Sequence, residues 1–464
     1  MTASRLPRFG LAFALNCAVA SYSAMQSVVI PLLPEIGSRF DASTADTAWV
    51  LSGFLLIGAA FTPVAGKVGD LIGRSKTLVA VLAIFLVGTV LAIFAQTLLL
   101  LIVARFIQGL GAASIALSLS IVKSSYPPGR VAGAIGRLSA TMAISTGLGL
   151  SLAGLLSTYF GFQTVFLVPL LLATAALIML LPTLASDPAA GGSVSGVNWV
   201  AGSLFTFGVL LILLAITQAN TWGWLSPLTL GTAALGGALL WLWAHIERRA
   251  THPLIDVRIL ASPNMRRINS ASFLVSVYMF AAYAMIPTFA QASPAEGPGL
   301  GVDTALAGLL MLPLAAMNFV AGSTAGMLTR KIGSRNVLLL GTALCLGNVV
   351  FITFFHDNTL ELMIACAAHG LSIGFAFASI PTLMMLAVDA SEAGVAAGIY
   401  STLRSLGGAL GTQIVFALMA IGGAALTMSD FQSALVFLLI VSSAAVVSAL
   451  LVPRTGRKKR PLQA

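Results

Sequence analysis

Two polar side chains one helical turn apart stand inside a long apolar stretch, where they could bind a solute or guide a proton. Arg105 and Gln108 lie within the apolar residues 98–123, and their spacing places them on one face of a helix. An arginine inside a membrane is costly unless it faces water or a partner. We therefore expect Arg105 and Gln108 to line a cavity. The alternative is that Arg105 snorkels to the nearer interface.

Arg404 is a second cation inside an apolar stretch. If its helix begins near Glu392, Arg404 lies about 18 Å along the axis, at about 1.5 Å per residue. We predict that Arg404 is deep in the membrane and takes part in substrate or proton coupling. The alternative is that its helix begins with a cytoplasmic turn, which would make Arg404 shallower.

His369 is the only histidine deep in an apolar stretch, and imidazole titrates near neutral pH. We predict that His369 carries a proton, with Glu35 at an outer mouth as the second candidate. The alternative for His369 is a neutral imidazole hydrogen-bonded between helices. Gln26 is a further candidate for lining the cavity, although such a residue alone often serves as a helix–helix hydrogen bond.

The acidic residues are absent from the centres of the apolar stretches. All 14 Asp and Glu residues fall in or near the predicted loops. An exporter of lipophilic cations would be expected to balance the ligand charge with a buried carboxylate. We therefore expect a neutral or anionic amphiphilic substrate.

Composition requires that lipid surrounds most of the chain. The sequence has 464 residues, of which 58% are hydrophobic and 8% charged, whereas soluble proteins have about 25% charged residues. Too few charges are present to cover a soluble surface. The net charge of +10 is explained by loop residues that anchor helices to an anionic leaflet, so no nucleic-acid partner is expected.

Enzyme and cofactor signatures are absent from the sequence. The three cysteines have no pair spacing, so neither a disulfide framework nor a metal site is predicted. No phosphate-binding Gly-Lys-Ser/Thr loop is present, so ATP is not expected to drive the protein. We predict no catalytic residues and no cofactor.

Apolar runs of about 20 residues predict membrane-spanning helices. Fourteen such runs are found, and the sequence therefore predicts an all-α polytopic membrane protein with both termini on one side. The predicted helices are 8–34, 46–66, 77–96, 98–123, 131–157, 162–183, 198–217, 226–246, 267–291, 304–326, 336–355, 358–386, 393–421 and 430–452. If the amino terminus is cytoplasmic, Arg39 is the only loop Lys or Arg that falls outside, as the positive-inside rule requires.

The breaks between these runs predict the domain organisation. The two linkers are recognised by a Pro/Gly/Ser-rich stretch and by a charged stretch. The expected parts are an N-terminal six-helix bundle (1–183), a cytoplasmic linker (184–197), two inserted transmembrane helices (198–246), a second cytoplasmic linker (247–266), a C-terminal six-helix bundle (267–453) and a basic cytoplasmic tail (454–464).

A charged, glycine-punctuated stretch occurs twice, 260 positions apart. We interpret each copy as a short loop between two helices. The first holds Gly66, Asp70, Gly73 and Arg74, and the second holds Gly326, Arg330, Gly333 and Arg335.

Other short segments recur at offsets of 256 to 262, and His369 occupies the repeat position of Gln108. Two repeated bundles around a central site are the architecture of an alternating-access transporter.

These motifs resemble those of the major facilitator superfamily, and specifically its fourteen-helix drug:proton antiporter branch. The first glycine-punctuated stretch is similar to the family's signature loop, and residues 104–113 are similar to its helix-four motif. The resemblance implies the major facilitator fold and export of hydrophobic compounds across an inner or plasma membrane, driven by protons. A carboxylate at Asp70, near a helix end with cationic neighbours, can pair with Arg74 or Arg130 or cap a facing helix N-terminus. The resemblance implies that Asp70 belongs to a cytoplasmic latch. The alternative is ordinary anchoring of the loop at the interface.

Two positions depart from the family pattern. Met25 stands where that branch usually has an aspartate, and Gly149–Gly154 lacks the proline and one glycine of the usual helix-five motif. We predict a monomeric exporter of hydrophobic small molecules by proton antiport, in contact with membrane lipids. The departures favour one alternative, an uncoupled facilitator or importer of a neutral or anionic solute. A non-transporting membrane receptor or scaffold is the other.

Overall fold

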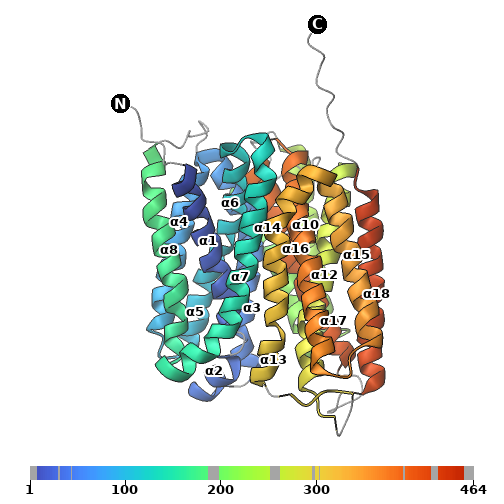
Figure 1. Cartoon of the computed structure of the whole chain (residues 1–464). Helices are drawn as coiled ribbons and strands as arrows, with labels where there is room; N and C mark the ends of the chain where they lie inside the picture. The colour runs from blue at the N-terminus through green and yellow to red at the C-terminus, as the bar shows by residue number, and fades with distance from the viewer. Residues whose placement is uncertain are drawn as a thin grey trace.

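Long helices that run side by side make up the protein, and no strand occurs among the described residues (Figure 1). The computed structural model describes residues 8–29, 32–42, 44–185, 198–250, 262–294, 298–302, 304–389, 392–419 and 427–453. The predicted tail over 454–464 and most of both predicted linkers lie outside these residues. Helix α1 begins and helix α18 ends at the same face of the bundle, which we call the terminal face (Figure 1).

The first half of the chain and the inserted pair contain the following elements. They are α1 (Arg8–Val28), α2 (Leu33–Arg39), α3 (Thr44–Ile72), α4 (Arg74–Ile93), α5 (Leu98–Gly109), η2 (Leu110–Ala112), α6 (Ala113–Ser125), α7 (Pro128–Phe160), η3 (Phe162–Phe166), α8 (Leu167–Leu180), η4 (Leu181–Ala185), α9 (Trp199–Trp222) and α10 (Pro227–Arg249).

The second half contains the remaining elements. They are α12 (Pro263–Gln291), α13 (Thr304–Leu310), α14 (Leu312–Ile332), α15 (Ser334–Phe354), α16 (Thr359–Ala387), α17 (Ala393–Met419) and α18 (Met428–Leu451).

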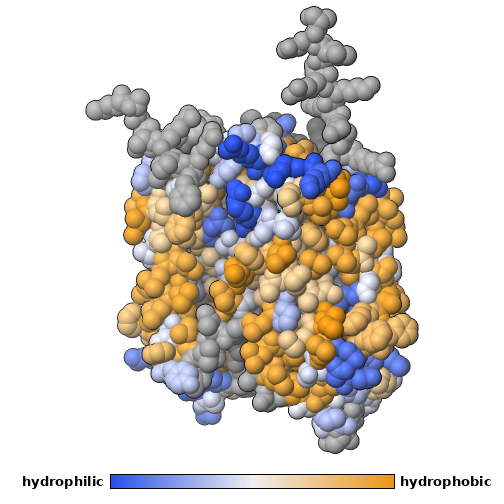
Figure 2. Space-filling model, viewed as in Figure 1, coloured by the Kyte–Doolittle hydropathy of each residue, from blue (hydrophilic) through white to orange (hydrophobic). Residues whose placement is uncertain are grey.

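Eleven helices or helix pairs among the described residues are long and apolar enough to cross a membrane. Three further helices, α1, α7 and α17, have 21, 33 and 27 residues and pack in the same bundle. The exact count of fourteen spans stays a prediction. Figure 2 shows a broad hydrophobic belt between hydrophilic groups at the two faces, as a multi-pass membrane protein requires.

Several predicted boundaries were wrong at prolines and glycines. The helix expected over 8–34 ends at Val28, and α2 begins separately at Leu33. Proline lacks the backbone N–H that continues a helix, and prolines at positions 31 and 34 explain the break. The helix expected over 98–123 contains a short 3-10 segment, η2, in which Gly111 packs against the ring of Phe85.

The two glycine-punctuated stretches are not loops. Helix α3 continues through Gly66 to Ile72, and the chain turns only at Gly73, whose φ of 116° is disfavoured for residues with a Cβ. Helix α14 likewise continues to Ile332 and turns at Gly333, with φ 86°. Backbone groups near a membrane need hydrogen-bond partners, so each helix is retained up to the glycine that ends it.

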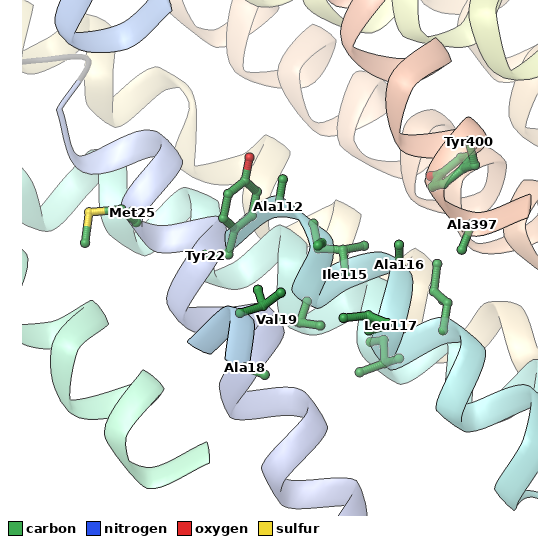
Figure 3. Packing of buried hydrophobic residues seen from close by; sticks show 14 of the residues in the cluster. Ala18, Val19, Tyr22, Met25, Ala112, Ile115, Ala116, Leu117, Ala397 and Tyr400 are labelled. Atoms are coloured by element: carbon green, nitrogen blue, oxygen red, sulfur yellow. The ribbon is translucent and has the colours of Figure 1, made fainter. Parts of the chain in front are cut away.

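The core joins both halves of the chain. Figure 3 shows Tyr22 of α1 beside Ala112 of η2, next to Ile115 and Ala116 of α6, with Ala397 and Tyr400 of α17 across from them; Met25 of α1 points to the other side. Helix α9 packs against both α3 and α17, so the inserted pair covers the place where the two halves meet. The contact is apolar, with Phe205 and Val209 of α9 buried in it.

Candidate functional site

Arg105 holds three helices together inside the first half. Its side chain is completely buried, and its Nε donates to the carbonyl oxygen of Val50 at 2.8 Å. Its Nη1 donates to the Gln108 side-chain oxygen at 2.9 Å and to the Met25 carbonyl oxygen at 3.3 Å. The guanidinium also lies 4.1 Å from the centre of the Phe54 ring. Arg105 thus links α5 to α1 and α3.

Gln108 extends this network to a fourth helix. Its amide nitrogen donates to the Gly88 carbonyl oxygen at 3.3 Å and to the Thr89 hydroxyl at 3.4 Å, both on α4. Arg105 and Gln108 have no exposed surface. Their hydrogen bonds are made to protein groups on α1, α3 and α4, so the two side chains fix how these helices pack against α5. The sequence placed the two residues together on one face, but they contact protein groups rather than an open cavity.

The second half contains a matching polar network around His369. The His369 Nδ1 lies 3.1 Å from the Tyr278 hydroxyl, and Asn348 donates to that hydroxyl at 3.2 Å. These contacts join α16, α12 and α15. The Tyr283 ring packs edge-on against His369, with ring centres 5.3 Å apart. His369 is fully buried within this cluster.

The two networks occupy equivalent places in the repeat. Gln108 and His369 are 261 positions apart, and Gly88 and Asn348 are 260 apart. The duplication therefore preserves the positions of the contacts while the side-chain chemistry differs. One half has a permanent cation, and the other has a group that can titrate.

Arg404 lies on α17, the second-half helix that packs against α3 and α6 of the first half. Its guanidinium lies 5.9 Å from the centre of the Phe280 ring and is partly exposed. It interacts electrostatically with the hydroxyl of Tyr22 in α1 and with those of Tyr283 and Tyr400 in the second half. Arg404 is thus a partly exposed cation whose charge acts on tyrosine hydroxyls of both halves.

The two remaining central candidates differ in position. Gln26 is partly buried and lies one turn after Tyr22 on α1, so the two share a face. Glu35 is exposed on α2 near the face opposite the terminal one, where the Ser157 hydroxyl of α7 donates to its carboxylate at 2.5 Å. Glu35 is therefore separate from the central cluster.

Asp70 joins the two halves at the terminal face. Its carboxylate accepts two hydrogen bonds from Arg74, the shorter at 2.7 Å. It also accepts from the backbone N–H of Gly394 at 3.1 Å and of Val395 at 3.3 Å. A carboxylate at this position caps the start of α17 and interacts favourably with its helix dipole. Arg130 is exposed at the start of α7, and the ion pair described for Asp70 is with Arg74.

Two glycine pairs bring the halves into backbone contact. A Cβ built on Gly66 would overlap the carbonyl oxygen of Gly394, and one on Gly326 would lie 2.6 Å from the Cα of Gly133. Gly326 lies 260 positions after Gly66, and Gly394 lies 261 positions after Gly133. The α3–α17 and α14–α7 contacts are therefore the same contact repeated, and we call them the two seams.

The second seam lacks the carboxylate of the first. Arg330 stands at the repeat position of Asp70, is exposed, and lies 3.7 Å from a Cβ built on Gly133. Arg335 instead donates to the carbonyl oxygens of Val452 and Leu450 at the end of α18. Among the described residues, a carboxylate therefore caps the facing helix at the α3–α17 seam, and Arg330 takes its place at the α14–α7 seam.

Replacing Asp70 with asparagine is expected to weaken closure of the terminal face. The amide would lose the ion pair and the charge on the α17 dipole while keeping the shape of the side chain. We expect a severalfold loss of transport with little loss of protein. The control is the replacement of Asp389, an exposed carboxylate near the same helix start, with asparagine, which should leave transport unchanged. The measurement is initial-rate flux normalised to purified protein; equal rates for the Asp70 variant and wild type would contradict the role.

Several residues of the site were not recognised from sequence as site residues. Tyr22 and Tyr400 interact electrostatically with Arg404, and Gly133 and Gly394 complete the seams. Tyr22 could have been found, because Tyr278 follows it at an offset of 256, which the repeated segment that begins at Val29 also shows. The partner glycines carry no comparable signal, since glycine is frequent throughout the chain.

Known proteins resemble this chain over nearly its full length. The multidrug resistance protein Stp of Mycobacterium tuberculosis is 28% identical over 399 residues, covering 85% of this chain and 72% of Stp. The drug efflux pump JefA of the same species is 31% identical over 416 residues, covering 87% of this chain and 79% of JefA. The solved structure of the human organic anion transporter MFSD10 matches the fold with a TM-score of 0.68 at 12% identity, covering 97% of this chain and 100% of that one.

The family itself follows from a match over most of the chain. Residues 15–412 match the Major Facilitator Superfamily, which confirms the resemblance predicted from the two sequence motifs. The two seams, each between a helix of the first half and a helix of the second, agree with the two-bundle arrangement of that fold. The chain belongs to the major facilitator superfamily and is a multi-pass membrane protein.

Proposed function

We propose that the protein exports hydrophobic small molecules by alternating access, in exchange for protons. Its family membership, the multidrug-resistance name of Stp and the drug-efflux name of JefA support transport of such compounds. The observation that carries the proposal is the pair of repeated glycine seams, each with one helix from each half. Two bundles that meet through such narrow backbone contacts can rock against each other and open either face of a central site.

The distribution of charge supports a cytoplasmic terminal face. Cationic residues that end or begin helices at this face include Lys67, Arg74, Lys76, Lys123, Arg130, Arg248, Arg249, Arg266, Arg267, Arg330, Lys331 and Arg335. The positive-inside rule assigns a face of this kind to the cytoplasm. We propose that both termini are cytoplasmic and that the protein lies in an inner or plasma membrane.

The central groups favour a neutral or anionic substrate. Arg404 supplies a partly exposed cation, and the hydroxyls of Tyr22, Tyr283 and Tyr400 interact electrostatically with it. No acidic side chain belongs to this group among the described residues. A quaternary ammonium compound at this site would meet a like charge with no carboxylate to balance it.

His369 is the proposed proton carrier. Two aromatic rings separate it from Arg404: the Arg404 guanidinium lies over Phe280, Phe280 packs edge-on against Tyr283, and Tyr283 packs edge-on against His369. A proton on the imidazole would add a second positive charge near the site and alter the affinity for an anionic substrate. For this role, the buried ring must become accessible to water during the transport cycle.

Replacing His369 with glutamine is expected to remove most of the dependence of export on pH, because glutamine cannot titrate near neutrality. The matched control is Tyr278 to phenylalanine, which removes the hydrogen-bond partner at 3.1 Å but leaves the imidazole. Export by each variant should be measured in proteoliposomes from pH 5.5 to pH 8. An unchanged pH profile in the glutamine variant would remove His369 from the proton pathway.

Flux in proteoliposomes tests the function itself. Purified protein would be given lipophilic dyes of similar size that are neutral, anionic or quaternary ammonium, with and without an imposed pH gradient. We expect transport of the neutral and anionic dyes, accelerated by the gradient. Preferential transport of the quaternary ammonium dye would contradict the substrate class.

The alternatives give different outcomes in the same assay. An uncoupled facilitator, favoured by the buried Met25 in place of an aspartate, would transport at the same initial rate with and without the gradient. A receptor or scaffold would give no flux above empty liposomes for any dye. Either result would contradict proton-driven export.

A further inference from the structure

A groove at the terminal face lies outside the central site and the seams. It runs between α12 and α18, has a volume of about 590 Å³, and is lined by Pro263, Arg266, Arg267, Ser270, Leu274, Ala444, Val447, Ser448 and Leu451. The α12 residues recur at helical spacings of three and four, as do those of α18, so each helix contributes one stripe. We call it the α12/α18 groove.

Polarity changes along the length of the groove. Arg266 and Arg267 lie in the first turns of α12 at the terminal face, and both are exposed. Leu274 and Ala444 line the deeper end. From Pro263 to Leu274 the groove extends about 16 Å, at about 1.5 Å per residue. One leaflet of a bilayer has a hydrocarbon depth of about 15 Å, so the groove spans the headgroup and the acyl region of a single leaflet.

The charged residues that line the groove are all positive. Two arginines line it, and no acidic residue is among the described residues of its wall. Arg335 is nearby on α15, but its guanidinium is already used by the Val452 and Leu450 carbonyl oxygens. The Ser448 hydroxyl donates to the Arg267 carbonyl oxygen at 3.3 Å and so ties the two walls together. Among the described residues, neither the Arg266 nor the Arg267 guanidinium forms a hydrogen bond or ion pair, so both can meet a ligand from outside.

We propose that the α12/α18 groove binds one anionic phospholipid. Its phosphate is held by Arg266 and Arg267, because guanidinium groups pair with phosphate oxygens through two hydrogen bonds. One acyl chain lies along Leu274, Ala444 and Val447. Basic pockets between helices at a membrane face are suited to such headgroups.

Native mass spectrometry of the purified protein in detergent tests this inference. Phosphatidylglycerol and phosphatidylcholine with the same acyl chains would be titrated against wild type and against the double variant Arg266→Gln/Arg267→Gln. Each arginine near an anionic headgroup contributes a factor of about five in affinity, so we expect phosphatidylglycerol to bind the double variant about 25-fold more weakly. Phosphatidylcholine should bind wild type weakly and be little affected by the substitutions.

Two further variants separate the groove from general attraction of anions. Arg248→Gln/Arg249→Gln removes two adjacent exposed arginines at the end of α10, outside the groove, and should leave phosphatidylglycerol binding unchanged. Ala444→Phe fills the groove without altering charge and should weaken binding at least fivefold.

Glycerol phosphate, which has the headgroup chemistry but no acyl chains, should not displace the lipid. Equal binding of the two lipids to wild type, equal loss in both double variants, or displacement by glycerol phosphate would overturn the proposal.

Discussion

Replacing Arg105 with methionine is expected to reduce export by at least about tenfold and to lower the thermal stability of the purified protein. The substitution leaves the Val50 carbonyl oxygen and the Gln108 side-chain oxygen without their buried donor, and an unmet buried hydrogen-bonding group costs about 1–3 kcal/mol. It also removes the cation over the Phe54 ring. Helices α1, α3 and α5 would lose the group that sets their spacing.

Lysine at position 105 is expected to give little rescue. A single ammonium cannot reproduce the planar fork that donates to Val50 and Gln108 at once. Arg39→Gln is the matched control, since Arg39 also lies over a phenylalanine ring, at 4.8 Å, but is exposed. Flux and thermal unfolding should be measured on the same preparations. Wild-type flux and stability in the methionine variant would show that the network does not position the helices.

Replacing Gly66 with valine is expected to have a similarly large effect on export, but through conformation rather than stability. Any Cβ at this position overlaps the Gly394 carbonyl oxygen while α3 and α17 are in contact, as they are in this structure. The backbones must separate, so the closed arrangement is destabilised while the arrangement open at this face is not. We expect export to fall at least about tenfold, with protein yield close to wild type.

Gly326→Val tests the second seam in the same way, because a Cβ there would lie 2.6 Å from the Cα of Gly133. Gly129→Ala is the control: this glycine lies at the start of α7, and a Cβ on it would meet nothing within 4 Å. Flux should be combined with the rate of modification of single cysteines facing the seam from the terminal side. If the Gly66 variant exports at the wild-type rate, close approach of α3 and α17 is not required for the cycle.

The repeat made much of this arrangement predictable. Matching segments 256 to 262 positions apart identified two equivalent halves, and the motif around Gly66 and Asp70 identified a joint between bundles. The fold agrees, since the two seams are related by the same offsets. Long apolar runs also located the helices, because the bilayer requires about 20 residues for each crossing.

Local geometry at the joints was less predictable. The stretch after Gly66 reads as a loop because it is charged and contains glycines, yet it is helical as far as Ile72. The two glycines have different roles: Gly66 allows close approach of another helix, and Gly73 provides the turn. Residue type alone does not separate these roles, since the first depends on a segment more than 300 positions away.

The surroundings of the polar residues also required the three-dimensional arrangement. Sequence placed Arg105 and Gln108 on one helical face, but did not show that Met25 and Val50 supply backbone acceptors. Nor did it identify the N–H groups of α17 that Asp70 caps, because contacts between distant helices leave no local pattern. A polar residue deep in an apolar run could thus be recognised from sequence as a site candidate. Its hydrogen-bond partners could not, because they depend on how distant helices pack together.

The central claim is that two equivalent halves rock about the site around Arg404. Distances between spin labels at both faces test it most directly, in a background in which the three buried cysteines, Cys17, Cys345 and Cys366, are replaced. One pair would label the exposed positions Ser125 and Lys331 at the terminal face. The other would label Ser38 and Asp357 at the opposite face.

Substrate and a pH step should be applied to the labelled protein in lipid. The account predicts opposite changes: the distance between Ser125 and Lys331 lengthens while the distance between Ser38 and Asp357 shortens. Two distances that stay fixed, or that lengthen together, in protein that transports would contradict rocking of the halves.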